Sequence, residues 1–265
     1  MKALHEIRRD IVAVCRAIDR REYVGGRDGN ISARTGSGTI VITPAALRKG
    51  DVEVDDLVVL APDGRQIAGR RRASSETGMH LRIYELRPDV NAVVHAHPPV
   101  STGFAAAGIE LNECVLPEVI VGLGRVPITP YATPGTDELS RSLDSVVASH
   151  DAILLQNHGA VTVGEDVLLA HQRMETLEHS ARILLVARLL GGANPLTVSQ
   201  VGELLDARSR YGVRAGLAAC DWAAPDASSG GRAGGTAGTS RGDDALVERI
   251  VKRVLDRLEE GPERA

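Results

Sequence analysis

Three histidines in two short segments are the residues of this chain whose types and spacing best suit chemistry. His95-Ala96-His97 closes an apolar run, residues 90–94, that is typical of a buried strand. Residues two apart on a strand point to the same side, so both imidazoles can reach one point. His158 follows a second apolar run, residues 152–155. Three neutral imidazoles that converge from two strand ends would form a zinc site with one position open for substrate, whereas the alternative is three separate polar caps.

Glu76 is the candidate acid–base residue. It follows Ser74 and Ser75, and the apolar residues at 79, 83 and 86 have the spacing of an amphipathic helix with the serines in N-cap position. The start of such a helix can bind an anion and can present a carboxylate. Taken alone, the segment is better explained by a serine that caps the helix and a glutamate that favours its positive end.

Six short motifs follow one another along the chain in a fixed order. They are Gly29-Asn30, Ile42-Thr43-Pro44, residues 73–80, His95-Ala96-His97, residues 131–136 and residues 156–159. Together they resemble the class II aldolase/adducin family, and most closely its fuculose-phosphate aldolase members, from about residue 5 to about residue 215. Each motif is weak by itself, and the ordered set is specific.

The resemblance implies catalytic roles. His95, His97 and His158 would hold one divalent metal ion, Zn²⁺, and Glu76 would move protons beside it. The tyrosine that matches Tyr131 reaches from a neighbouring subunit to protonate the aldehyde oxygen, and the structural alternative is a turn tyrosine before Pro134-Gly135. Tyr211, in a Tyr-Gly-Val-Arg segment, matches a C-terminal tyrosine near the family's active site.

The resemblance also implies a phosphate site. Its residues would be Gly29, Asn30, Thr43, Ser74 and Ser75, with backbone amides as further donors. After the Thr-Pro pair the family usually has a small hydroxyl residue and a glycine, whereas this chain has two alanines at positions 45 and 46. One hydroxyl donor is lost, so the phosphate is held differently or the substrate differs.

The elements that must position these residues indicate an α/β protein. Periodicity predicts a helix over residues 2–20, strands over 31–34, 39–42 and 57–60, a helix from residue 75, and a long helix over 165–190 that ends at two glycines. Because the strands do not alternate strictly with helices, we expect a three-layer α/β/α fold with a mixed, largely antiparallel central sheet. His171 and His179, on the long helix, are expected to be ordinary packing or surface histidines. Residues 1–223 would form one catalytic domain.

Composition excludes several classes of protein. The formal net charge of −4, one Trp and one Phe argue against a nucleic-acid partner. No run of 18 apolar residues suggests a membrane span, and the polar N-terminus does not resemble a signal peptide, so the protein is expected in the cytoplasm.

The predicted function is therefore a zinc-dependent class II aldolase. It would cleave a ketose 1-phosphate such as L-fuculose 1-phosphate to dihydroxyacetone phosphate and a short aldehyde such as lactaldehyde, and it would act as a homo-oligomer, by resemblance a tetramer. A Schiff-base aldolase is disfavoured, because it needs a buried lysine and Lys2, Lys49 and Lys252 are expected in polar contexts. The alternatives are an epimerase, which carries aspartate where Glu76 stands, a dehydratase or decarboxylase of the same family, and a non-catalytic adducin-like binding module.

The C-terminus has a different composition. Residues 224–242 contain six glycines and little that could be buried, which predicts a flexible linker of about 25 Å root-mean-square reach. Residues 243–260 then predict an amphipathic helix with four basic and six acidic groups, a charge balance that disfavours a membrane surface. This arrangement resembles the encapsulation peptides that target cargo enzymes to the shells of bacterial microcompartments. Self-association of the tails is the alternative.

Overall fold

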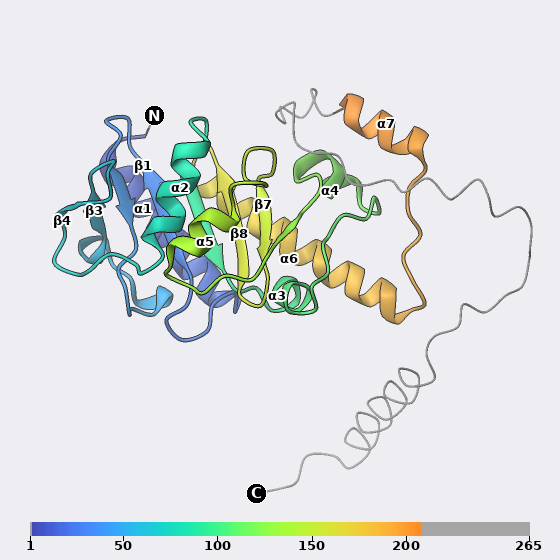
Figure 1. The fold of residues 1–265 in the computed structure, drawn as a ribbon, viewed down its shortest axis with the longest axis horizontal. Helices are drawn as coiled ribbons and strands as arrows, with labels where there is room; N and C mark the ends of the chain where they lie inside the picture. The colour runs from blue at the N-terminus through green and yellow to red at the C-terminus, as the bar shows by residue number, and fades with distance from the viewer. Residues whose placement is uncertain (1, 208–265) are drawn as a thin grey trace, which may run out of the picture. The chain divides into compact units, whose positions relative to one another are not determined.

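The computed structural model describes residues 2–207 (Figure 1). Its strands are β1 (Asn30–Arg34), β2 (Ile40–Ile42), β3 (Val58–Leu60), β4 (Gln66–Ala68), β5 (Ala92–Ala96), β6 (Ile128–Thr129), β7 (Ala152–Leu155) and β8 (Gly159–Gly164). Its α-helices are α1 (Leu4–Arg20), α2 (Thr77–Leu86), α3 (Pro99–Ala106), α4 (Pro117–Gly122), α5 (Asp137–Ser142), α6 (Val167–Leu189) and α7 (Val198–Ala207). Tyr211, the predicted linker and the predicted tail helix lie outside the described residues.

The strands form one sheet in the order β4-β3-β2-β1-β5-β8-β7-β6. All neighbouring pairs are antiparallel except β6 and β7. The predicted mixed, largely antiparallel sheet is therefore confirmed. Within residues 2–207, no helix is both long and apolar enough to cross a bilayer.

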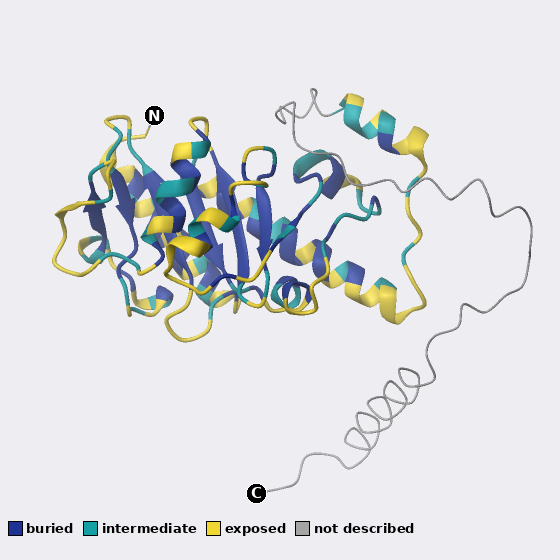
Figure 2. Cartoon of the chain, in the orientation of Figure 1, coloured by how far each residue is buried: buried dark blue, intermediate teal, exposed yellow. Residues whose placement is uncertain are grey.

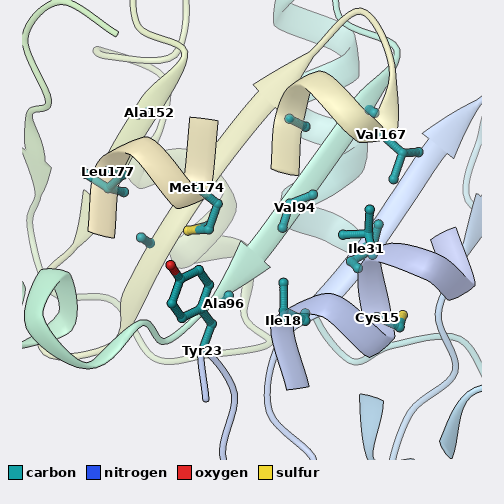
Figure 3. Packing of buried hydrophobic residues seen from close by; sticks show 14 of the residues in the cluster. Cys15, Ile18, Tyr23, Ile31, Val94, Ala96, Ala152, Val167, Met174 and Leu177 are labelled. Atoms are coloured by element: carbon teal, nitrogen blue, oxygen red, sulfur yellow. The ribbon is translucent and has the colours of Figure 1, made fainter. Parts of the chain in front are cut away.

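Alternation along the central strands separates two cores. Val94 and Ala96 of β5 face a cluster built with α1, α3 and α6, whereas Val93 faces a cluster built with α2 and α5. Figure 3 shows Ile18 of α1 and Met174 of α6 packed close to Val94 and Ala96. Figure 2 shows the central strands buried between helices whose outer faces are exposed, which is the expected three-layer α/β/α arrangement, and the edge strand β4 is exposed.

The two long helices form where the sequence predicts them. The apolar stripe of α1 is buried, including Ile11 and Ile18. The Asp166 side chain accepts a hydrogen bond from the Leu169 amide at 2.9 Å and so caps the start of α6. Its end is followed by two glycines, at positions 191 and 192, with φ of 110° and 126°.

Two local predictions are wrong. The serines do not cap α2: the N-cap residue is Glu76, without a side-chain cap bond, and the helix begins at Thr77. The cause is pairing with a distant loop, because the Ser74 amide donates to the Thr43 carbonyl at 3.3 Å and Pro44 bridges Ala73. His158 does not end a strand but lies in the tight turn that joins β7 to β8.

Candidate active site

The three predicted histidines come together at one end of the central strands. His95 lies on β5, His97 follows that strand, and His158 comes from the β7–β8 turn. Each histidine offers one nitrogen atom that lies within 4.8 Å of those of the other two. Within residues 2–207, no other three His, Cys, Asp or Glu side chains come together in this way. The Nε2 atoms of His95 and His97 are 3.2 Å apart. The cluster is a candidate site for a divalent metal ion.

Surrounding backbone atoms orient the imidazoles. His95 Nδ1 donates to the Ala160 carbonyl at 2.9 Å, which leaves its Nε2 lone pair facing the other rings. His97 Nδ1 lies 3.6 Å from a carboxylate oxygen of Asp28. Gly159 leaves room for the His97 ring, because a Cβ at 159 would lie 2.5 Å from His97 Cδ2. Orientation by carbonyl and carboxylate groups is typical of metal-binding histidines.

Burial sets the protonation state of the cluster. It lowers the pKa of His95 and of His97, and the neighbouring imidazoles add to the effect. Both rings are therefore neutral at pH 7, which is the form that binds a metal ion. Neutral imidazoles that converge from the end of β5 and from the β7–β8 turn fit a zinc-type ion in their donor chemistry.

Glu76 lies against the cluster. Its carboxylate oxygens are 3.3 Å from His95 Nε2 and 3.2 Å from His158 Nε2, and Asn30 Nδ2 donates to Oε2 at 2.7 Å. Burial alone would raise the pKa of this carboxyl group. At the acidic pH at which the group titrates, the protonated His95 ring and the hydrogen bonds from His158 and Asn30 outweigh burial and lower the pKa below its usual value. A buried, ionised carboxylate beside a metal-binding cluster is suited to proton transfer.

The predicted phosphate-site residues lie on segments that meet beside Glu76. Asn30 and Thr43 are buried, and the Thr43 hydroxyl accepts from the Ile31 amide at 3.1 Å. Ser74 Oγ accepts from the Glu76 amide at 3.3 Å, and Ser75 is exposed.

Gly29 packs against the backbone of His95. It has φ of 72°, and a Cβ there would lie 2.8 Å from the His95 carbonyl oxygen. The structure thus brings Gly29 against the His95 backbone and Asn30 and Ser74 against Glu76, while the binding of phosphate by the five residues stays a prediction.

The alanine pair after Pro44 keeps a glycine-like backbone. Ala46 has φ of 58°, in the left-handed region that glycine adopts most easily. The Ala45 amide donates to the Arg72 carbonyl at 2.9 Å, so it is already engaged. The sequence therefore departs from the family pattern at these two positions without opening the loop.

Lys49 corrects one sequence-based expectation. It is 1% exposed rather than placed in a polar context, and its Nζ donates to the carbonyls of Arg27 and Leu47 at 3.1 and 2.9 Å. Burial lowers its pKa. Because these carbonyls belong to the loops that precede Asn30 and follow Thr43, Lys49 ties the two loops together.

Tyr131 does not face a buried partner in the described chain. It is 55% exposed, and its amide donates to the Gln156 side chain at 3.1 Å. Its role across a subunit boundary remains a prediction, as does the role of Tyr211, which lies outside residues 2–207.

Three residues that were not predicted from the sequence support this site. Asp28 faces His97, Gly159 makes room for it, and His80 hydrogen-bonds Asn30. The signals available were a spacing of four residues from Glu76 to His80 and a glycine directly after His158. Neither signal names a partner without the tertiary structure.

Comparison with known proteins agrees with this geometry. The family described as "Class II Aldolase and Adducin N-terminal domain" matches residues 9–185. The chain belongs to this family. It is similar to the 3-oxo-tetronate 4-phosphate decarboxylase of Escherichia coli (strain K12), with 30% identity over 212 residues that span 78% of this chain and 98% of the relative.

Relatives named as aldolases match this chain at a similar sequence identity. The L-fuculose phosphate aldolase of Methanocaldococcus jannaschii is 32% identical over 183 residues, 69% of this chain and 98% of that protein. A solved structure of an L-fuculose 1-phosphate aldolase, 26% identical, has a TM-score of 0.72 and covers 79% of this chain and 98% of its own. The family therefore includes aldolases and decarboxylases that act on sugar phosphates.

Proposed function

We propose that this protein is a zinc-dependent aldolase that cleaves a ketose 1-phosphate of the L-fuculose 1-phosphate kind to dihydroxyacetone phosphate and a short aldehyde such as lactaldehyde. The observation that carries the proposal is the ionised Glu76 carboxylate held against His95 and His158. When bound by the three histidines, a divalent ion polarises the substrate carbonyl and stabilises the negative charge that develops as the adjacent carbon–carbon bond breaks.

The proton transfers then belong to the protein. Cleavage of the C3–C4 bond leaves the electron pair on C3, and C3 must receive a proton to give dihydroxyacetone phosphate. The C4 hydroxyl loses one proton as the aldehyde forms, and C3 gains one. The two changes balance when the hydroxyl of Tyr131 of the partner subunit accepts the C4 proton and passes its own on to the Glu76 carboxylate, which then delivers it to C3. In condensation the transfers run in reverse: the carboxylate removes the proton from C3, and Tyr131 gives one to the aldehyde oxygen.

A decarboxylase is the second candidate, because a named decarboxylase matches over 98% of its length. Loss of C1 as carbon dioxide from a 3-oxo-tetronate 4-phosphate leaves an electron pair on C2, beside the C3 carbonyl. Protonation of C2 again yields dihydroxyacetone phosphate. The two reactions therefore share the product and the role of Glu76, and they differ in the leaving fragment. Carbon dioxide carries no hydroxyl proton, so decarboxylation does not need Tyr131.

The test is release of dihydroxyacetone phosphate from L-fuculose, L-rhamnulose and 5-deoxypentulose 1-phosphates and from 3-oxo-tetronate 4-phosphate, with and without chelator. Aldolase activity predicts release from a ketose 1-phosphate that chelator abolishes. Glu76→Gln should keep the metal and lower kcat by about two to four orders of magnitude. Tyr131→Phe should slow sugar cleavage.

Other results would assign other functions. Release from the oxo acid alone, insensitive to Tyr131→Phe, identifies a decarboxylase. An epimerised or dehydrated product identifies those branches of the family. Absence of both metal and turnover supports an adducin-like binding module.

We further propose that the active protein is a homotetramer, because the predicted role of Tyr131 requires a neighbouring subunit. Light scattering during turnover tests this proposal, and an active monomer would refute it.

Residues 243–260 are proposed to be a docking helix for shell proteins of a bacterial microcompartment in the cytoplasm. The support is the sequence pattern of a linker followed by an amphipathic helix. Deletion of residues 224–265 should preserve activity and abolish co-purification with shell proteins, and residues 240–265 should recruit a fluorescent protein to shells. Loss of activity or folding on deletion would contradict the proposal.

A further inference from the structure

A row of polar side chains leads away from Glu76 beneath α2. Asn30 and Ser32 lie two apart on β1, and Glu76, His80 and Tyr84 lie four apart along the start and first turns of α2. Two strand residues advance about 6.6 Å and four helical residues about 6.0 Å, so the two rows stay in step. All five side chains are buried, with His80 and Ser32 at 0% exposure.

The row is joined by an unbroken series of hydrogen bonds. Asn30 Nδ2 donates to Glu76 Oε2 at 2.7 Å, and Asn30 Oδ1 contacts His80 Nε2 at 2.5 Å. On the other side of the imidazole ring, His80 Nδ1 lies 2.7 Å from Ser32 Oγ. Ser32 Oγ lies 2.7 Å from the Tyr84 hydroxyl.

The chemistry of the groups gives this series one direction. The ionised Glu76 carboxylate only accepts, so the NH₂ group of Asn30 faces it and the Asn30 oxygen must accept from His80 Nε2–H. Burial lowers the pKa of His80 to about 4, so the ring carries one proton at pH 7. Its Nδ1 then accepts from the Ser32 hydroxyl, and Ser32 accepts from Tyr84. Every donor points towards Glu76.

We propose that His80 is a positioning residue that, by fixing the orientation of the Asn30 amide, holds the Glu76 carboxylate in place for proton transfer. The proposal rests on the proposed acid–base function of Glu76. An amide does not pass protons along, so the series orients the carboxylate and does not relay protons to it. Without the His80 donor, the Asn30 amide is free to turn and to present its oxygen to the carboxylate, which repels it.

The functional test compares two substitutions at position 80 in the full chain. His80→Gln retains an N–H donor close to the place of Nε2, whereas His80→Phe retains the ring shape and loses the donor. The readouts are kcat, KM, zinc content and the exchange of a carbon-bound hydrogen of dihydroxyacetone phosphate with deuterated water. Exchange reports proton transfer at carbon without the aldehyde. The matched control is His171→Gln, because His171 is also a buried helical histidine, on α6, and lies outside the hydrogen-bonded row.

We expect His80→Phe to lower kcat and exchange together by about 10- to 100-fold, the cost of misplacing a catalytic group, while zinc content stays near the unsubstituted value. His80→Gln should recover most of the lost rate, and His171→Gln should match the unsubstituted protein. Equal losses in both His80 variants, or an unchanged rate in His80→Phe, would overturn the proposal.

A measurement independent of turnover separates this proposal from the proposed function. The ¹⁵N spectrum of histidine-labelled protein should show His80, assigned by its loss in His80→Gln, as the Nε2–H tautomer at pH 7. An Nδ1–H tautomer would contradict the series of hydrogen bonds. If the unsubstituted protein shows the Nε2–H tautomer but neither cleavage nor exchange, the aldolase function fails while the hydrogen-bonded row stands.

Discussion

Gly159→Ala should weaken metal binding without any change of a ligand. An alanine Cβ at this position would lie 2.5 Å from His97 Cδ2 and 2.7 Å from the Ala96 carbonyl oxygen. The carbonyl belongs to β5, which is paired with β8 on one side and β1 on the other, so the backbone has little freedom to retreat. The imidazole of His97 must move instead.

The size of that movement sets the expected effect. An ordinary contact of 3.4 Å requires His97 Cδ2 to retreat by about 0.9 Å, whereas metal–ligand distances hold to within about 0.2 Å. We therefore expect zinc affinity to fall by about 10- to 100-fold, as it does when groups that orient ligands are removed. The overpacked backbone should also lower the free energy of unfolding by about 1–3 kcal/mol.

The assay is competition for zinc with a chromophoric chelator, together with urea unfolding of the metal-free protein. Gly103→Ala is the matched control, because a Cβ there meets no atom within 4 Å and α3 favours alanine over glycine. That variant should bind zinc normally and be slightly more stable. Unchanged zinc affinity in Gly159→Ala would show that zinc binding does not depend on the position of the His97 ring beside Gly159.

Three further predictions concern stability. His80, which faces the titratable groups of Glu76 and Tyr84, has a pKa lowered from 6.5 to about 4, so below pH 6.5 the unfolded chain takes up a proton that the folded chain does not. About 3 kcal/mol of the free energy of unfolding should be lost between pH 6.5 and pH 4. The free energy of unfolding of His80→Gln, measured with urea at each pH, should depend less on pH over that range, and an equal pH dependence in the two proteins would refute the buried neutral state. Ala46→Gly should raise the free energy of unfolding by up to about 1 kcal/mol by relieving the left-handed φ of 58°, and a lower melting temperature would contradict this. Asp151→Ala removes the 1% exposed carboxylate that pairs with both Arg87 and Arg173 and should cost about 3–5 kcal/mol in urea unfolding, so a cost below 1 kcal/mol would count against a structural role of these two ion pairs.

Features that depend on neighbouring residues were predictable from the sequence. The apolar repeats of α1 and α6, the short strands β1, β2, β3, β5 and β7, and the glycines after α6 all follow from local periodicity and turn chemistry. The shared direction of His95 and His97 follows from the two-residue repeat of a strand. The six motifs were sufficient to predict the family, because their residue types and their order along the chain can be read without the structure.

Pairing between distant segments decided the remainder. Strand β8 was not predicted from the sequence, yet its pairing with both β5 and β7 brings the turn with His158 beside His95. The extended pairing of Ser74 with Thr43 displaced the predicted cap of α2, and the meeting of two loops buried Lys49.

The row from Glu76 to Tyr84 depends on the same kind of contact. His80 is an ordinary helical residue by its local sequence, and it hydrogen-bonds the Glu76 partner Asn30 only because α2 packs in step with β1. Local sequence alone was enough to predict the candidate catalytic residues and the direction in which each segment presents them. The register of strands and helices far apart in the chain decided which of those residues meet, because burial and hydrogen bonding across the fold outweigh local preference.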